Sequence, residues 1–446
     1  MSSDLLIINA GVVNENTERE ADVLIHDGRI VEIGPDLSAR PAKKVIDAAG
    51  RHLLPGMIDD QVHFREPGLT HKGDIATESR AAVAGLTLGI SIKEVMPPAT
   101  LTLEALEEKY QRATGRSAAN FAFYLGASNN NLEEIKRLDP NQACGVKVFM
   151  GASTGNMLVD RMDALEGIFQ HSPILIATHC EDTPMIHANE KAAREKYGED
   201  VPMWEHANIR NADTCYASSS LAVSLAKQTG AKLHVLHLTT AREMELFTCG
   251  DINSKQITAE ACVHHLWFNS DDYDRLGAQI KCNPAIKTPA DQAAILQAVR
   301  DDRIDIIATD HAPHTSEEKA GKYFSSPAGL PLVQHAMLSL LDQVKRGIFE
   351  LTMVVRKTSH AVADRYQMAE RGYIREGYFA DLILVDMNKS TKVTHDNLLY
   401  KCGWSPFEGV TFGASIDMTL VNGQIVWDGE KPAEPVFGQR LAFSRT

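Results

Sequence analysis

Residues 55–68, PGMIDDQVHFREPG, begin as a short apolar strand and end in a run of polar side chains. Within them, every second position is polar: Asp59, Gln61, His63 and Arg65. Because alternate side chains of an extended segment share one face, this spacing predicts four polar groups together at one strand end. An imidazole beside a carboxylate suits a divalent metal, and a guanidinium suits a substrate carboxylate. A polar strand end entering a surface loop shows the same pattern, so this stretch alone leaves both interpretations open.

The middle of the chain alternates between strand-like and helix-like segments. Eight apolar runs have the length and composition of strands, at about 55–63, 86–92, 120–127, 145–151, 174–179, 232–238, 256–265 and 304–310. Helix-like stretches separate them, among them 101–114, 218–229 and 290–302. This alternation predicts an α/β fold with a parallel sheet, and eight units favour a (β/α)8 TIM barrel with its active site at the C-terminal strand ends. An open doubly wound sheet is the alternative.

Both ends of the chain have a different sequence pattern, with short runs in which apolar and polar residues alternate and with turn signals such as Asn422-Gly423. We expect the two ends to pair into one small β-sandwich domain, composed of residues 1–54 plus 371–446, beside a barrel of residues 55–370. Two unrelated surface hairpins are the alternative.

The composition narrows the function. The chain has 446 residues, 44% of them hydrophobic and 23% charged, which is ordinary for a soluble globular protein. Its formal charge of −14 argues against nucleic-acid or anionic-membrane partners. No apolar run is long enough to cross a membrane, and no glycine-rich nucleotide motif follows a strand. The seven cysteines are scattered, which predicts a reduced, cytoplasmic protein.

Titratable side chains recur at the predicted strand ends. They are His63, Lys147, His179, His237, His264, His265 and Asp310. A structural histidine explains any one of them, but a barrel gathers all its strand ends around one opening, and imidazoles with a carboxylate suit zinc. Lys147 lies in an apolar run, GVKVF, where a bare ammonium is costly to bury. It either pairs with a carboxylate or is modified into an anion.

Taken together, HFREPG (63–68), GVKVFMG (145–151), IATHCED (176–182), LHVLHLTT (233–240) and ATDHAPH (308–314) resemble the dihydroorotases of the cyclic amidohydrolase family. The resemblance covers almost the whole chain. It implies a zinc-dependent hydrolase of pyrimidine biosynthesis that reversibly cyclises N-carbamoyl-L-aspartate to L-dihydroorotate.

The resemblance also implies a metal centre with one or two zinc ions. His63 and Asp310 would hold one zinc, His179 and His237 a second, and a carboxylated Lys147 would bridge them. A metal-bound hydroxide would attack the ring amide, and Asp310 would serve as general acid and base.

The substrate would be a small molecule, and the resemblance assigns its binding to Arg65, Asn283 and His314. It further implies a homo-oligomer, a dimer or a tetramer.

Two positions depart from the family pattern. Gln61 stands where the first histidine of an H-x-H pair belongs, which makes it a doubtful ligand and predicts that the first metal is weakly held or absent. Val95 stands where an asparagine usually binds the substrate carboxylate, and Lys93 is a candidate replacement. These departures keep two alternatives open. One is a related cyclic amidohydrolase with another ring-amide substrate, and the other is a catalytically silent paralogue that acts as a binding subunit.

Overall fold

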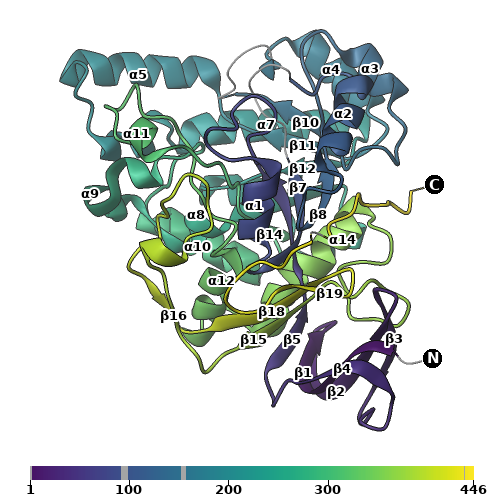
Figure 1. Cartoon of the computed structure of the whole chain (residues 1–446). Coiled ribbons are helices and arrows are strands. Elements are labelled where there is room, and N and C mark those ends of the chain that lie inside the picture. Colours follow the sequence, from purple (N-terminus) through teal and green to yellow (C-terminus); the bar gives the residue numbers. More distant parts are fainter. Residues whose placement is uncertain (1–2, 92–98, 152–156, 436, 446) are drawn as a thin grey trace.

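The computed structural model describes residues 3–91, 99–151, 157–435 and 437–445. Most of the chain forms a (β/α)8 barrel, which confirms the predicted fold class (Figure 1). Its strands are β6 (Met57–Val62), β7 (Leu86–Ser91), β8 (Asn120–Phe123) continued by β9 (Leu125–Gly126), β10 (Val146–Phe149), β11 (Ile176–His179), β12 (Leu233–Val235), β13 (Ile257–Cys262) and β14 (Ile306–Ala308). Neighbouring strands are parallel, and the His63 N–H donates to the His311 carbonyl at 2.7 Å where the ring closes.

Helices follow the strands and cover the outside of the barrel (Figure 1). The longer ones are α1 (Ile75–Ala82), α2 (Leu103–Ala113), α4 (Met162–His171), α5 (Thr183–Tyr197), α7 (Ala212–Thr229), α10 (Pro289–Arg300) and α12 (Ala336–Lys345). Local sequence sets their ends. Helix α7 begins after Asn211, which accepts two backbone N–H groups, and ends before Gly230, which has the left-handed φ of 78° that glycine tolerates. None of the helices in the described ranges combines the length and the hydropathy that a membrane span needs.

A β-sandwich domain forms from both ends of the chain. The N-terminal strands are β1 (Ser3–Asn14), β2 (Thr17–His26), β3 (Arg29–Gly34), β4 (Ala42–Asp47) and β5 (His52–Pro55), and the C-terminal ones are β15 (Leu382–Asp386), β18 (Ser415–Val421) and β19 (Gln424–Trp427). Strand β5 pairs antiparallel with β15, so the two ends share one sheet and one apolar core. Because β6 begins the barrel just after β5, we propose domain boundaries near residues 54 and 370.

The seventh barrel strand ends earlier than the sequence pattern indicates. Strand β13 stops at Cys262, and helix α8 (Val263–Trp267) follows at once. His264 and His265 therefore lie on the first turn of a short helix rather than on a strand.

Candidate active site

The first barrel strand ends in a bulge that changes which side chains share a face. The pairing of β6 with β7 shifts register between Asp59 and Val62, and such a shift re-aims the side chains that follow it. Asp59 accepts the backbone N–H and the hydroxyl of Thr309, and burial raises its pKa well above the ordinary value. The expectation that Asp59 joins Gln61 and His63 on one face is therefore wrong.

Gln61 and His63 instead meet at Asp310. Gln61 Nε2 donates to Asp310 Oδ1 at 3.0 Å, and His63 Nε2 lies 3.1 Å from the same oxygen. A carboxylate without a proton only accepts, so the amide nitrogen of Gln61 faces it and the amide oxygen turns towards Cys262 Sγ, 3.9 Å away. Burial alone would raise the pKa of Asp310, but the hydrogen bond and charge of His63 lower it below the ordinary value. Asp310 is thus held as a carboxylate.

A second pair of candidate ligands lies at the ends of β11 and β12. His179 Nδ1 is 2.9 Å from His237 Nε2. The other nitrogen of His179, Nε2, lies 2.9 Å from Glu181 Oε2, which also accepts from Arg210 at 2.6 Å. Burial opposes ionisation of Glu181, but Arg210 and His179 lower its pKa to about 2. The carboxylate therefore accepts a hydrogen bond from the Nε2–H group, and the Nδ1 lone pair of His179 is directed at His237.

The resemblance did not include Glu181 or Arg210. Glu181 follows His179 at a spacing of two, so strand alternation offered a signal for it. Arg210 is the residue that caps the C-terminal end of α6 (His206–Ile209), and it contacts Glu181 from there. No pattern in the sequence pointed to this contact.

Glu260 is a further residue that the sequence patterns did not single out. It lies on β13, is buried, and accepts the backbone N–H of His237 through Oε1 at 3.0 Å. His237 has a φ of 39°, in the left-handed region that few non-glycine residues adopt. Asp310 and Arg65 share this unusual conformation, with φ values of 51° and 64°. Strained backbone of this kind gathers where side chains are held for a purpose.

Lys147 interacts electrostatically with both of these pairs. Its side chain is 1% exposed, and its Nζ is 4.8 Å from the centre of the Phe149 ring. In the described part of the chain, Nζ makes no ion pair. Burial lowers its pKa to about 8, against the attraction of Asp310 and Glu260. About a tenth of the amine is consequently neutral at pH 7.

Arg65 and His314, two predicted substrate-binding residues, lie together. The guanidinium donates through Nε to the Pro313 carbonyl at 2.9 Å, and its NH2 group is 3.1 Å from His314 Nε2. Lys72 Nζ lies 2.9 Å from the other ring nitrogen, His314 Nδ1. Burial, followed by the charges of Arg65, Lys72 and Lys319, lowers the pKa of His314 far below its ordinary value. His314 is therefore neutral, and the cluster around it is cationic.

Asn283, the third predicted substrate-binding residue, precedes Pro284 on a segment next to this cluster. Its Oδ1 is buried and has no hydrogen-bond partner in the described chain, so the amide has one acceptor to offer. The segment is tied to the loop after β14 because the Gly329 N–H donates to the Lys281 carbonyl at 2.9 Å. Lys93 and Val95, the two positions discussed for the substrate carboxylate, lie outside the described residues.

The site fits a bound metal. His63 and His237 each keep a buried ring nitrogen, Nδ1, without a hydrogen-bond partner in the described ranges. An unpaired buried polar atom costs about 1–3 kcal/mol, so such atoms in one site suggest that another group satisfies them. Three imidazoles with a carboxylate form a donor set that suits zinc better than magnesium or calcium.

Comparison with known proteins identifies the family. The sequence profile of the amidohydrolase family matches residues 52–426. The chain belongs to the amidohydrolase family. It is 32% identical over 420 residues to a dihydroorotase of Halobacterium salinarum, an alignment that covers 92% of this chain and 96% of that protein. It is 31% identical over 449 residues to an allantoinase of Escherichia coli O1:K1 / APEC, covering 97% of this chain and 96% of that one.

Solved structures agree with this assignment. An L-hydantoinase (dihydropyrimidinase) from Arthrobacter aurescens superimposes with a TM-score of 0.91 and 27% identity, over 99% of this chain and all of that one. All three relatives are cyclic amidohydrolases, and so is this chain, which confirms the expectation of an enzyme. The names of the relatives differ in the ring that is opened, so they do not identify the substrate of this chain.

Proposed function

We propose that this amidohydrolase is a zinc-dependent dihydroorotase, which interconverts N-carbamoyl-L-aspartate and L-dihydroorotate in pyrimidine biosynthesis. The observation that carries the proposal is the buried guanidinium of Arg65 beside neutral His314. Dihydroorotate carries a carboxylate on its ring, whereas hydantoin and allantoin carry none. An arginine at this position, oriented by the Pro313 carbonyl, has the charge and the planar shape that suit that carboxylate.

The charge around Arg65 favours an anionic substrate. Lys72 is paired with Glu318 at 3.1 Å, so that pair is neutral. Lys319 donates to three backbone carbonyls, of Lys281, Pro327 and Gly329, and because burial lowers its pKa to about 7 it adds only part of a positive charge to the same region. A ring substrate with a carboxylate gains from this positive potential, and a neutral ring does not.

The candidate ligands fall into the two sets that a zinc centre of this kind requires. His63 and Asp310 would hold one ion, His179 and His237 a second, and Lys147 would contribute to both as its carbamate. The neutral fraction of Lys147 supports this modification, because a neutral amine is the form that adds carbon dioxide. When bound, zinc would polarise the ring carbonyl and lower the pKa of a water molecule towards 7.

The orientation of the Gln61 side chain does not suit a metal ligand at the His63–Asp310 position. Its amide nitrogen faces Asp310, and a protonated amide nitrogen has no lone pair to offer a metal. We therefore propose that the His63–Asp310 position binds zinc more weakly than the His179–His237 position.

Asp310 is the residue that moves the proton. It is a carboxylate and accepts from Gln61 and His63 through Oδ1. In ring opening it would take a proton from the attacking water and deliver it to the ring nitrogen that leaves. In ring closure it would act in the reverse direction.

A second candidate function is the opening of a different ring amide. The observation that favours it is the similar identity of the chain to a dihydroorotase and to an allantoinase. The two functions differ in the charge of the substrate, so the same assay separates them.

The test is a comparison of L-dihydroorotate, hydantoin and allantoin as substrates of the purified full-length protein, supplied with zinc and bicarbonate. We expect dihydroorotate to have the highest kcat/KM. Replacing Arg65 with methionine removes a charge-assisted hydrogen bond worth about 1.5–3 kcal/mol, so kcat/KM for dihydroorotate should fall roughly 10- to 150-fold. Arg242→Met is the matched control, because Arg242 pairs with Asp213 on the surface.

An equal response of all three substrates to Arg65→Met would contradict the proposal. Activity on allantoin alone would establish the second candidate, and a protein with neither metal nor activity would point to a binding subunit.

We also propose that the enzyme works in the cytoplasm as a dimer or tetramer. Its seven cysteines are all free thiols, which suits a reducing compartment. Light scattering on the purified protein measures the oligomeric state.

A further inference from the structure

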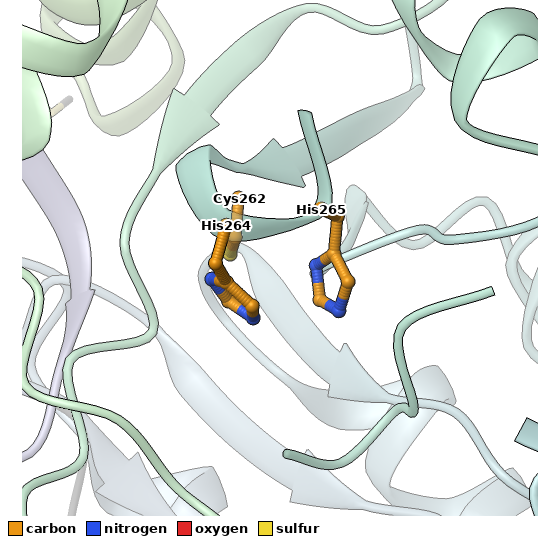
Figure 2. A group of neighbouring side chains, drawn as sticks. All are labelled: Cys262, His264 and His265. Atoms are coloured by element: carbon orange, nitrogen blue, oxygen red, sulfur yellow. The ribbon is translucent and has the colours of Figure 1, made fainter. Parts of the chain in front are cut away.

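Three potential metal ligands lie together at the end of the seventh barrel strand. Cys262 is the last residue of β13, and His264 and His265 belong to the first turn of α8. One ligand atom from each residue lies within 4.8 Å of the other two, and all three side chains are buried (Figure 2). The two imidazole rings lie beside each other, with centroids 3.9 Å apart, and the Cys262 sulfur lies behind the ring of His264.

His265 is already in the tautomer of a metal ligand. Its Nε2 lies 3.1 Å from the Pro284 carbonyl, which only accepts, so Nε2 carries the proton. The Nδ1 lone pair is buried and has no hydrogen-bond partner in the described chain. Metal-binding histidines typically donate one N–H to a carbonyl and present the other nitrogen to the ion.

His264 is even less satisfied. It is 1% exposed, and neither of its ring nitrogens has a hydrogen-bond partner among the described residues. The Thr309 carbonyl and the Asp310 carboxylate are the acceptors that face it, although neither meets hydrogen-bond geometry. Buried polar side chains are nearly always paired. Three unpaired nitrogens on two adjacent imidazoles therefore indicate a missing partner.

The donor set selects the kind of partner. Two imidazole nitrogens and one thiolate prefer zinc and similar cations over magnesium or calcium, which take oxygen ligands. Zn–N bonds of about 2.0 Å and Zn–S bonds of about 2.3 Å place tetrahedral donors roughly 3.5 Å apart. The three donor atoms lie within 4.8 Å of one another, so they would have to approach by about an ångström when an ion binds.

The amide oxygen of Gln61 is the candidate for a fourth ligand. The Gln61 amide oxygen lies 3.9 Å from Cys262 Sγ, on the side away from Asp310. The Cys262 thiol now points at Glu260 Oε1, 3.4 Å away, and its proton would be released to solvent when the sulfur binds the ion as a thiolate.

We propose that Cys262, His264 and His265 form a further binding site for a zinc-like divalent cation, next to the His63–Asp310 and His179–His237 positions but distinct from them. The site has a ligand chemistry that neither of those positions shares, because it alone contains a thiolate. It does not depend on which ring the enzyme opens.

Cobalt substitution tests the proposal directly. Full-length protein is stripped of metal with a chelator and titrated with Co2+, because thiolate-bound cobalt absorbs strongly in the near ultraviolet while cobalt bound to histidine and carboxylate does not. The background variant is Cys249→Ser, which removes the exposed thiol. We expect the thiolate absorption at saturating Co2+ to correspond to one thiolate-bound ion per chain and to vanish when zinc is added in competition.

Two variants locate the signal. Cys262→Ser should abolish the thiolate absorption and lower the bound metal by one ion per chain. Cys282→Ser is the matched control, because this buried thiol lies only 3.7 Å from His265 Nε2 and belongs to no predicted ligand set. Its spectrum should match the background. Lys147→Met should also keep the absorption, since Lys147 belongs to the other metal positions.

Absence of the thiolate absorption from the background protein at saturating Co2+ would overturn the proposal. This measurement uses the background protein alone, so it does not depend on whether any other variant folds. Loss of the absorption in Cys282→Ser but not in Cys262→Ser would overturn it as well. Circular dichroism of each variant shows that a lost signal reflects a lost ligand.

Discussion

Glu260 Oε1 accepts the backbone N–H of His237 at 3.0 Å, and this bond holds a histidine whose backbone is in the left-handed region. Glu260 lies on β13, and His237 follows the end of the neighbouring strand β12 at the mouth of the barrel. The Glu260 carboxyl group, whose pKa is raised by burial, thus acts on the candidate ligand through its main chain, and the imidazole stays free to meet His179. Glu260 is a positioning residue in this arrangement.

The first prediction tests this positioning. Glu260→Met removes the acceptor, so His237 can relax out of its strained conformation, and zinc affinity should fall about 10- to 100-fold. Glu260→Gln keeps an acceptor oxygen in place and should retain most of the affinity. Competition with a chromophoric chelator measures both dissociation constants. Equal losses in the two variants would show that the charge of Glu260 matters and its hydrogen bond does not.

The second prediction concerns Arg210, which compensates the buried charge of Glu181. The pKa of Glu181 is lowered from 4.5 to about 2, so this carboxylate contributes stability that is present above pH 4.5 and is lost as the pH falls towards 2. Removing one partner of a buried ion pair costs about 3–5 kcal/mol. Arg210→Met should therefore lower Tm markedly at pH 7.

The difference in Tm between Arg210→Met and the wild type should shrink as the pH falls below 4.5, because Glu181 then loses its charge in the variant. Arg242→Met, which disturbs a surface pair with Asp213, is the control and should behave like the wild type. A difference in Tm that does not depend on pH would refute the role assigned to the ion pair.

The third prediction uses the depressed pKa of Lys147. Burial lowers it from 10.5 to about 8, so between pH 8 and 10.5 the unfolded chain binds more protons at this position than the folded one. Stability must then rise with pH across this window. In metal-free protein prepared without bicarbonate, Tm of the wild type should rise relative to Lys147→Met between pH 8 and 10.5. Parallel curves would show that the buried lysine is not neutralised by deprotonation.

The fourth prediction concerns Gln61. Because its amide nitrogen faces Asp310, Gln61 adds no ligand to the proposed His63–Asp310 position. Gln61→His should supply an imidazole and raise the amount of zinc that survives dialysis against a mild chelator. Gln61→Asn is the control, since it keeps the amide and adds no imidazole. Metal analysis of the dialysed proteins measures the retained zinc. If Gln61→His retained no more zinc than the wild type, the His63–Asp310 position would already have a full set of ligands.

Much of the fold could be predicted because it depends on local patterns. Eight apolar runs of strand length lie between helical segments, and all eight form barrel strands in the structure. The alternation of apolar and polar residues works wherever a strand is regular, which is why His179 was found at the end of β11. It failed at Asp59, where a register shift between two strands changes the side on which the following residues point. A shift of this kind is set by the partner strand and leaves no mark in the local pattern.

The chemical groups at the strand ends could be predicted from the amino-acid sequence, because composition and spacing are properties of the chain alone. His63, His237 and Asp310 could be named in this way. How those groups face one another depends on the tertiary structure. The amide of Gln61 turns its nitrogen to Asp310 because the first and last barrel strands meet where the ring closes. Glu260 reaches the backbone of His237 because two consecutive strands pack side by side. These contacts join residues that are distant in sequence, and their geometry is set by the packing of the whole barrel.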